Sequence, residues 1–220
     1  MKIKGKKTLS LSLSFLIVLG ATTFCFSAHV TGNETVDSYM PVYYVSSTGS
    51  DSNDGLTAEE PFATLKKATS KAADGDILIY ILGSYVLKPS DITSHSSVVT
   101  ICGYDDESEI ISENGSGVGF GGPAILKNIT YTRGTNAYIV TSGQSIVFDD
   151  GFAASSSSDW FVFGGRQGCS VTPGFDVTVK DGSFTGEFVL GGMMPVTGHH
   201  VTGDVSLYMF GGNVNTVKLG

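Results

Sequence analysis

Carboxylate side chains occur in three short groups, and their oxygen atoms are the ligands that Ca²⁺ prefers. Each group stands among turn-forming or loop-forming residues, which favours a solvated turn over a metal site. For the group nearest the N-terminus, a calcium-loop alignment also places Pro61 where a glutamate is required. Calcium is therefore only a candidate cofactor, and we assign no metal ligand. The groups are Asp51 with Asp54, Asp105 with Asp106 and Glu107, and Asp149 with Asp150.

Three further motifs could carry chemistry. His199 and His200 are adjacent, and neighbouring residues of a strand point to opposite faces, so a shared metal is not expected. Residues 117–122 fit the pattern GxGxxG, but Pro123 and a β-type run follow where a dinucleotide site needs a helix. Four aromatic residues could stack on sugar rings, although strand alternation should place at least half of them in the core. They are Trp160, Phe161, Tyr208 and Phe210.

The elements that would position these groups begin with a strand, a polar turn and a helix. Residues 42–46 are β-prone, and residues 49–55 concentrate Gly, Ser, Asp and Asn. Pro61 suits the first turn of a helix that should end near Ala73. This helix could bury a narrow apolar stripe while its lysines lie elsewhere. The stripe comprises Phe62, Leu65, Ala68, Thr69 and Ala72.

From residue 77 onward only strand signals occur. They are short β-branched runs separated by Gly, Ser, Asn or Asp, and the first run is apolar on both faces. Because no later segment could supply the helices of βαβ units, a Rossmann or TIM architecture is not expected. The runs are residues 77–82, 98–101, 110–111, 124–126, 129–131, 138–140 and 146–148.

A repeat appears in the last third of the chain. Residues 146–152 match 177–183 at an offset of 31, and residues 176–179 match 204–207 at an offset of 28. A companion strand recurs after each copy and should align Phe163, Leu190 and Leu219 in an interior column. Its copies are residues 161–163, 188–190 and 217–219. This period is typical of solenoids, and the glycine pairs after the companion strands should form tight corners with positive φ.

The opening strand, turn and helix together resemble the start of secreted right-handed parallel β-helix proteins of the pectate-lyase-like superfamily. The glycine-ended repeats resemble those of large bacterial surface proteins. The resemblance covers most of the chain after residue 42 and implies an all-β, right-handed parallel β-helix (a solenoid) with a short N-terminal capping α-helix. The capping helix would close one end of the stacked coils.

The same resemblance implies two enzymatic activities, calcium-assisted β-elimination of uronate polymers and hydrolysis by paired carboxylates. Elimination needs a Lys or Arg that removes a proton beside carboxylates that hold Ca²⁺. Hydrolysis needs two or three Asp side chains on one open face, and no motif identifies such a group. The candidate bases are Arg133, Arg166, Lys127 and Lys180.

The N-terminus has the pattern of a secretory signal, which predicts a secreted or cell-surface protein. Four lysines precede a short apolar stretch, and cleavage is expected between Ser27 and Ala28. Removal of residues 1–27 takes away four of the 13 basic residues and none of the 21 acidic ones, so the formal charge becomes −12. Such a surface repels phosphate backbones, so no nucleic-acid partner is expected. Cys102 and Cys169 should be buried thiols rather than a disulfide framework.

The predicted organisation is a signal peptide over residues 1–27, a flexible leader over residues 28–41 and a β-helix domain over residues 42–220. Because the chain stops directly after a strand, we expect this domain to continue in a longer bacterial protein with further C-terminal domains. The expected function is adhesion or glycan binding, with polysaccharide or host and cell-wall glycans as partners. The alternative is a polysaccharide lyase or glycoside hydrolase acting on acidic polysaccharides.

Overall fold

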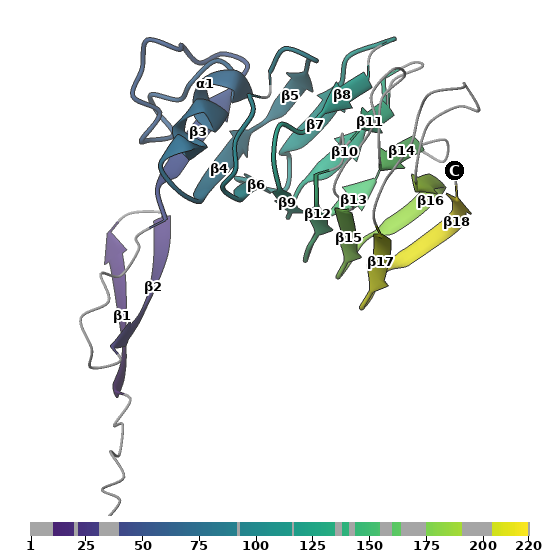
Figure 1. Cartoon of the computed structure of the whole chain (residues 1–220). Helices are drawn as coiled ribbons and strands as arrows, with labels where there is room; N and C mark the ends of the chain where they lie inside the picture. Colours follow the sequence, from purple (N-terminus) through teal and green to yellow (C-terminus); the bar gives the residue numbers. More distant parts are fainter. Residues whose placement is uncertain are drawn as a thin grey trace, which may run out of the picture. The chain divides into compact units, whose positions relative to one another are not determined.

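The computed structural model spans the chain and describes residues 11–19, 22–30, 40–91, 93–115, 117–134, 138–140, 144–154, 160–163, 175–190 and 204–219 (Figure 1). The chain divides into two compact units, Met1–Tyr39 and Met40–Gly220. In the first unit, β1 (Leu11–Leu19) pairs with β2 (Thr22–Val30) in antiparallel fashion. The expected cleavage point between Ser27 and Ala28 falls within β2. The signal peptide and the leader therefore stay predictions.

Three parallel sheets build the second unit, and the expected all-β class is confirmed at this level. The seven-stranded sheet runs β17-β15-β12-β9-β6-β4-β3, the five-stranded sheet β18-β16-β14-β11-β8 and the four-stranded sheet β13-β10-β7-β5. In the seven-stranded sheet the strands are β3 (Val42–Ser46), β4 (Ile77–Leu82), β6 (Val99–Gly103), β9 (Ala124–Lys127), β12 (Ile146–Phe148), β15 (Phe175–Val179) and β17 (Val205–Met209). In the five-stranded sheet they are β8 (Gly117–Gly119), β11 (Tyr138–Val140), β14 (Trp160–Phe163), β16 (Ser183–Leu190) and β18 (Asn213–Leu219). In the four-stranded sheet they are β5 (Ser84–Leu87), β7 (Glu109–Ser112), β10 (Thr130–Thr132) and β13 (Ala153–Ala154).

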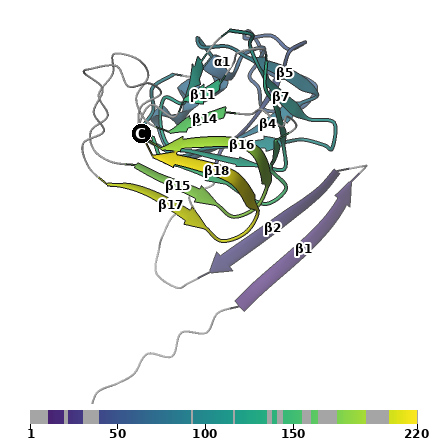
Figure 2. The same cartoon turned by 90° about the vertical axis from the view of Figure 1, so that its right-hand side faces the viewer.

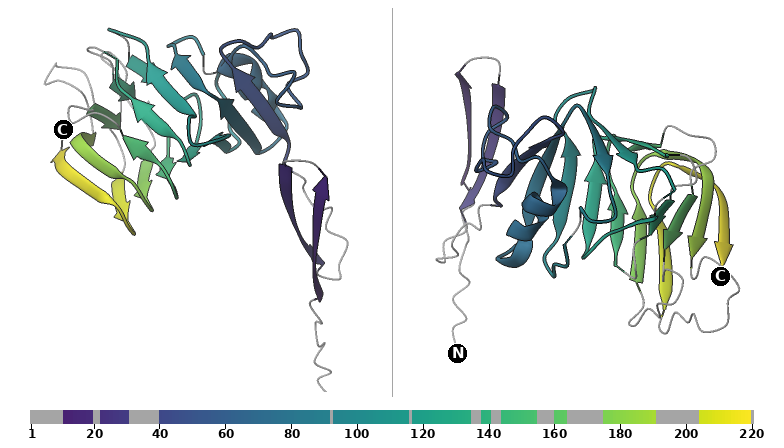
Figure 3. Two further views of the ribbon diagram at one scale, coloured as in Figure 1. Left: turned by 180° about the vertical axis from the view of Figure 1, so that it is seen from behind. Right: turned by 90° about the horizontal axis from the view of Figure 1, so that it is seen from above.

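From β4 onward, consecutive strands along the chain belong to different sheets, so each sheet is built from strands that are far apart in the sequence. After β6 it passes through β7 and β8, and it then returns to the seven-stranded sheet as β9, beside β6. Successive strands of each sheet consequently follow one another side by side, as the views along and across the row show (Figures 2 and 3). Strands β5, β8 and β13 are additions to the predicted set.

The helix is shorter than predicted, because its first residues have another role. It consists of α1 (Leu65–Thr69), continued by the 3₁₀ turn η1 (Ser70–Ala73), so the predicted end at Ala73 is confirmed. The predicted start at Pro61 is wrong. Phe62 forms a parallel bridge with Val45, and the Pro61 carbonyl accepts a hydrogen bond from the backbone N–H of Ser50. Thr64 then caps the helix by accepting from the N–H of Lys67.

Apolar columns run through the interior, because parallel pairing in register places like positions above one another. One column in the seven-stranded sheet aligns Ile79, Ile101, Leu126, Phe148 and Val179, and all five are buried. In β4 the odd residues are buried and the even ones half-buried, so this strand is not enclosed on both faces as predicted. Each fully buried aliphatic or aromatic side chain contributes about 1.5–3 kcal/mol relative to its exposed state.

The predicted repeat is confirmed in part. Ile146 pairs with Val177, which is the predicted offset of 31. Val177 pairs with Leu207, so the true offset there is 30 and the predicted 28 is wrong by two residues. Because side chains alternate with a period of two, this error leaves the predicted inward and outward faces unchanged.

The companion strands pair in the predicted register, which aligns Phe163 with Leu190 and Leu190 with Leu219. Leu190 is buried, as an interior column requires. The predicted glycine-pair corners, at residues 164–165 and 191–192, lie outside the described residues. In the repeat region, positive φ occurs at Gly151, Gly182 and Gly212, which follow the first strands of the three copies.

Candidate ligand-binding face

Three tyrosines cluster on the outer face of the seven-stranded sheet. The rings of Tyr44 and Tyr80 stack with centroids 5.6 Å apart and planes 26° from parallel. The Tyr104 ring lies 5.9 Å from each of them and stands edge-on, at 71° to Tyr44 and 84° to Tyr80. We call Tyr44, Tyr80 and Tyr104 the tyrosine cluster. Its rings present faces in two nearly perpendicular directions.

Strand pairing and one buried serine place the tyrosine cluster. Tyr44 and Tyr80 are direct partners in β3 and β4, so their side chains leave the sheet on the same face. Tyr104 follows β6, and its backbone N–H donates to the carbonyl of Ile81 and to Ser108 Oγ. Ser108 is buried and also accepts from the N–H of Asp105. This turn fixes the backbone from which the Tyr104 ring projects.

The cluster is partly exposed. Tyr104 is 41% exposed, while Tyr44 and Tyr80 are half-buried. Burial raises the pKa of the Tyr80 phenol, with smaller contributions from Cys102 and Tyr104. The Tyr80 hydroxyl consequently keeps its proton. It combines an apolar ring with a hydrogen-bonding tip, which suits contact with polyhydroxylated ligands.

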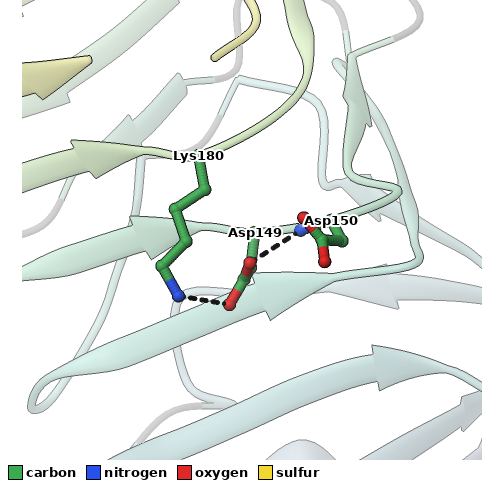
Figure 4. A network of polar contacts seen from close by, with 3 residues as sticks. All are labelled: Asp149, Asp150 and Lys180. Carbon is green, nitrogen blue, oxygen red and sulfur yellow. Dashed lines mark hydrogen bonds and ion pairs between the residues drawn. The ribbon is translucent and has the colours of Figure 1, made fainter. Parts of the chain in front are cut away.

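The position occupied by Tyr80 in β4 is occupied by a cysteine in the next strand of the sheet and by charged residues in or just after the strands that follow. Cys102 pairs with Tyr80 and Lys127 pairs with Cys102. The next two strands end immediately before Asp149 and Lys180, which lie side by side (Figure 4). Lys180 Nζ is 2.8 Å from Asp149 Oδ2. The outer face therefore changes from aromatic to charged along the row of strands.

The Asp149 carboxylate is held by two donors. Besides Lys180, the backbone N–H of Asp150 donates to Asp149 Oδ1 over 2.9 Å (Figure 4). The hydrogen bond and charge of Lys180 lower the pKa of Asp149, with help from that N–H. Asp150 forms part of the corner, since its carbonyl accepts from the N–H of Asn128. The expected solvated turn at this position is supported, and a predicted base meets a predicted carboxylate there.

The carboxylates of the other two acidic groups accept hydrogen bonds from nearby backbone and hydroxyl groups. Asp51 Oδ1 accepts from the N–H groups of Ala63 and Thr64, and its Oδ2 accepts from the Thr64 hydroxyl. Asp54 accepts from the N–H of Leu56, while Asp105 accepts from Glu107 and Ser108. Within the described ranges, no three His, Cys, Asp or Glu side chains are grouped as metal ligands.

Several predicted candidates do not gather with the tyrosine cluster. Arg166, His199, His200 and Cys169 lie outside the described residues, as do the side chains of Trp160 and Phe161. Tyr208 and Phe210 are 47% and 76% exposed, at and just beyond the end of β17. They belong to the last strand of the sheet, whereas the tyrosine cluster belongs to the first three. Residues 117–119 form β8 and the next element is β9, so the GxGxxG run has no helix after it.

The tyrosine cluster was not predicted from the sequence, although Tyr44 stands in the opening motif. Its members come from positions 44, 80 and 104, and their spacings match no repeat in the chain. A search for outward aromatic residues in the first strands could have found them, once the pairing of β3, β4 and β6 was known.

Comparison of the chain with protein-family models, curated proteins and solved structures gives no match. Across the part of the chain that the structure describes, no helix is long and apolar enough to cross a membrane.

Proposed function

We propose that this protein is a secreted or cell-surface module that binds glycans through the outer face of its seven-stranded sheet, as part of a longer bacterial adhesion protein. The proposal includes a right-handed parallel β-helix like those of the pectate-lyase-like superfamily. The turn-by-turn visiting of three parallel sheets and the aligned apolar columns support this architecture. The basic and apolar N-terminal segment supports export.

The tyrosine cluster is the observation that carries the binding proposal. Pyranose rings have an apolar C–H face that stacks on aromatic rings, and their hydroxyl groups bond to polar tips such as phenols. Tyr44, Tyr80 and Tyr104 supply both at one place, where Tyr104 is 41% exposed and Tyr44 and Tyr80 are half-buried. The acidic net charge favours uncharged sugars over polyanions.

An enzymatic function has less support. Asp149 and Lys180 do lie together, as a lyase would require of a carboxylate and a base. However, Lys180 Nζ is already held in an ion pair with that carboxylate and does not point toward a separate substrate position. A third carboxylate is not grouped with them in the described ranges. Incubation with uronate polymers and Ca²⁺ should therefore yield no unsaturated product, and Asp149-dependent cleavage would instead establish the lyase.

The binding proposal is tested on a panel of uncharged plant, host and cell-wall glycans. We expect the wild-type protein to retain some of them, and the Y80A/Y104A double variant to lose at least about tenfold in affinity, because each stacked ring contributes on the order of 1 kcal/mol or more. The matched control is Y208A, which removes an exposed tyrosine from the far end of the same sheet. Equal loss in both variants, or no retained glycan, would refute the proposal.

The architecture is tested separately by a distance between spin labels. Positions 42 and 178 occupy the same outward column and are separated by five strand spacings. At about 4.8 Å per spacing, the backbone distance should be about 24 Å. A sandwich of antiparallel sheets would break this relation between strand count and distance.

A further inference from the structure

The tyrosine cluster also has the geometry for a covalent reaction, independent of glycan binding. We propose that Tyr44 and Tyr80 form an oxidative cross-linking site, at which a peroxide and a haem peroxidase convert the two phenols to dityrosine. Their backbones are direct partners in adjacent strands, and their rings are stacked. The two side chains are thus held together before any reaction begins.

Ring orientation favours this pair over the other contacts of the cluster. At 26° from parallel, the two rings can bring the carbons beside their hydroxyl groups close to one another through small side-chain rotations. Tyr104 stands at 84° to Tyr80, so only one edge of its ring can approach. Tyr85 and Tyr131 are buried, with their hydroxyl groups bonded to Asp91 and Ser112.

Tyr104 gives an oxidant access to the pair. It is the most exposed ring of the cluster and contacts both of the others. A radical formed on Tyr104 can be passed to Tyr80 across this contact, as Tyr80 gives up a hydrogen atom and Tyr104 regains one. Tyr104 is accordingly a relay residue, and it is not consumed.

The chemistry balances with one peroxide for each cross-link. Each phenol loses one electron and one proton, and the two phenoxyl radicals couple through a carbon–carbon bond between ring positions next to the oxygens. The hydrogens on these two carbons then move to the phenoxyl oxygens, which restores both phenols. Peroxide is reduced by the two electrons and, with the two protons, becomes two molecules of water.

The bond would secure the helical end of the fold. Residues 45–79 lie between the two tyrosines and include α1 and η1, so the cross-link would close them into a loop. Closing a loop reduces the freedom of the unfolded chain more than that of the folded chain. We therefore expect a higher unfolding temperature after oxidation.

The full chain is treated with hydrogen peroxide and a haem peroxidase at several protein dilutions, and then digested and analysed by mass spectrometry. We expect a linked peptide pair containing Tyr44 and Tyr80, lighter by two hydrogens than the two separate peptides, with a yield independent of dilution. Y44F and Y80F should abolish it, Y104F should reduce it several-fold, and Y208F should leave it unchanged. Phenylalanine keeps the ring, so circular dichroism should confirm that all four variants fold.

The proposal is overturned if cross-links form only between molecules, or if folded wild-type protein gives no Tyr44–Tyr80 link. A link that persists in Y80F between Tyr44 and Tyr104 would contradict the assigned pair. Because the assay contains no glycan, its failure would leave the binding proposal untouched, and loss of glycan binding would leave this one untouched.

Discussion

At the scale of single residues, a buried hydrogen-bond chain joins the start of α1 to β5. The N–H of Leu65 donates to the Tyr85 hydroxyl over 3.0 Å, and this hydroxyl donates to Asp91 Oδ2 over 3.0 Å. Asp91 Oδ2 also accepts from the N–H of Lys88 over 2.9 Å. Tyr85 and Asp91 are both buried, so the loss of one partner leaves another without compensation by water.

We predict that Y85F lowers the free energy of unfolding by about 1–3 kcal/mol, because it leaves the Leu65 N–H and the Asp91 carboxylate each short of a partner. Denaturant titration measures the change. The matched control is Y208F at an exposed tyrosine, for which we expect a change within about 0.5 kcal/mol. Equal stability of the two variants would show that the chain of bonds has no energetic role.

The raised pKa of Tyr85 predicts that the protein loses stability in alkali. Burial is the main cause that raises the pKa of Tyr85 above its ordinary value of 10.0. A raised pKa means that the stabilising effect is complete below pH 10 and is lost as the pH rises above it, because the unfolded chain then releases its proton first. Y85F should lack this component, so its stability should fall less than that of the wild type between pH 9 and 11, measured by denaturant titration at each pH. Parallel pH curves would contradict the assignment.

The ion pair of Lys180 and Asp149 should matter little for stability. The side chains are 47% and 19% exposed, and exposed pairs contribute about 0.2–1 kcal/mol. The lowered pKa of Asp149 means that this contribution is present above pH 3.8 and is lost as the pH falls through the folded-state value. K180M should therefore cost at most about 1 kcal/mol at pH 7, less in high salt, and nothing in strong acid. A larger cost, unaffected by salt, would show that the pair is effectively shielded from solvent.

At the scale of elements, close backbone contacts at the corners fix how strands follow one another. The N–H of Gly103, at the end of β6, donates to the carbonyl of Asn128 over 3.0 Å. Asn128 itself has a φ of 46°, and its side-chain amide donates back to the Gly103 carbonyl. A Cβ on Gly103 would lie 2.1 Å from the Asn128 oxygen, so no side chain fits without a shift of the backbone.

Two glycine-to-alanine variants distinguish the energetic cost of a steric clash from the cost of an unfavourable backbone conformation. Gly83 has a φ of 63° and open space where its Cβ would be, so G83A should cost about 1–2 kcal/mol through backbone strain alone. G103A should cost more, about 3 kcal/mol or above, because a methyl group there forces the backbones at Gly103 and Asn128 apart. Thermal or denaturant unfolding of both variants measures this order. A reversed order would mean that the corner can relax around a methyl group.

Local sequence predicted most strands, because β-branched runs bounded by glycine and polar turns have few alternatives. Failures arose where a distant partner decides the structure. Pro61 and Phe62 fit a helix by local preference, but pairing with Val45 holds them extended. Strands β8 and β13 read Gly-Val-Gly and Ala-Ala, and they are strands only because neighbours of the same sheets pair with them. The tyrosine cluster was missed for the same reason, since the pairing of β3 with β4 and the turn after β6 bring its members together.

At the scale of the whole molecule, the second unit keeps its aliphatic and aromatic columns inside and places the tyrosine cluster outside. Only the interior columns could be predicted, because they follow from alternation and repeat, whereas an outward cluster needs the register of three strands. Inside, Phe148, Phe184 and Phe188 pack with centroids 4.8 to 6.1 Å apart. Outside, three rings in similar contact are left partly in water. These partly exposed rings are the groups on which the proposed glycan binding rests.

The most direct test is an NMR titration of protein carrying labelled tyrosine rings with a glycan retained on the panel. If this face is the binding site, the ring signals of Tyr44, Tyr80 and Tyr104 shift in a saturable manner while those of Tyr85 and Tyr131, buried in the core, stay in place. Saturable shifts confined to tyrosines outside the cluster, with Tyr44, Tyr80 and Tyr104 unmoved, would contradict the account.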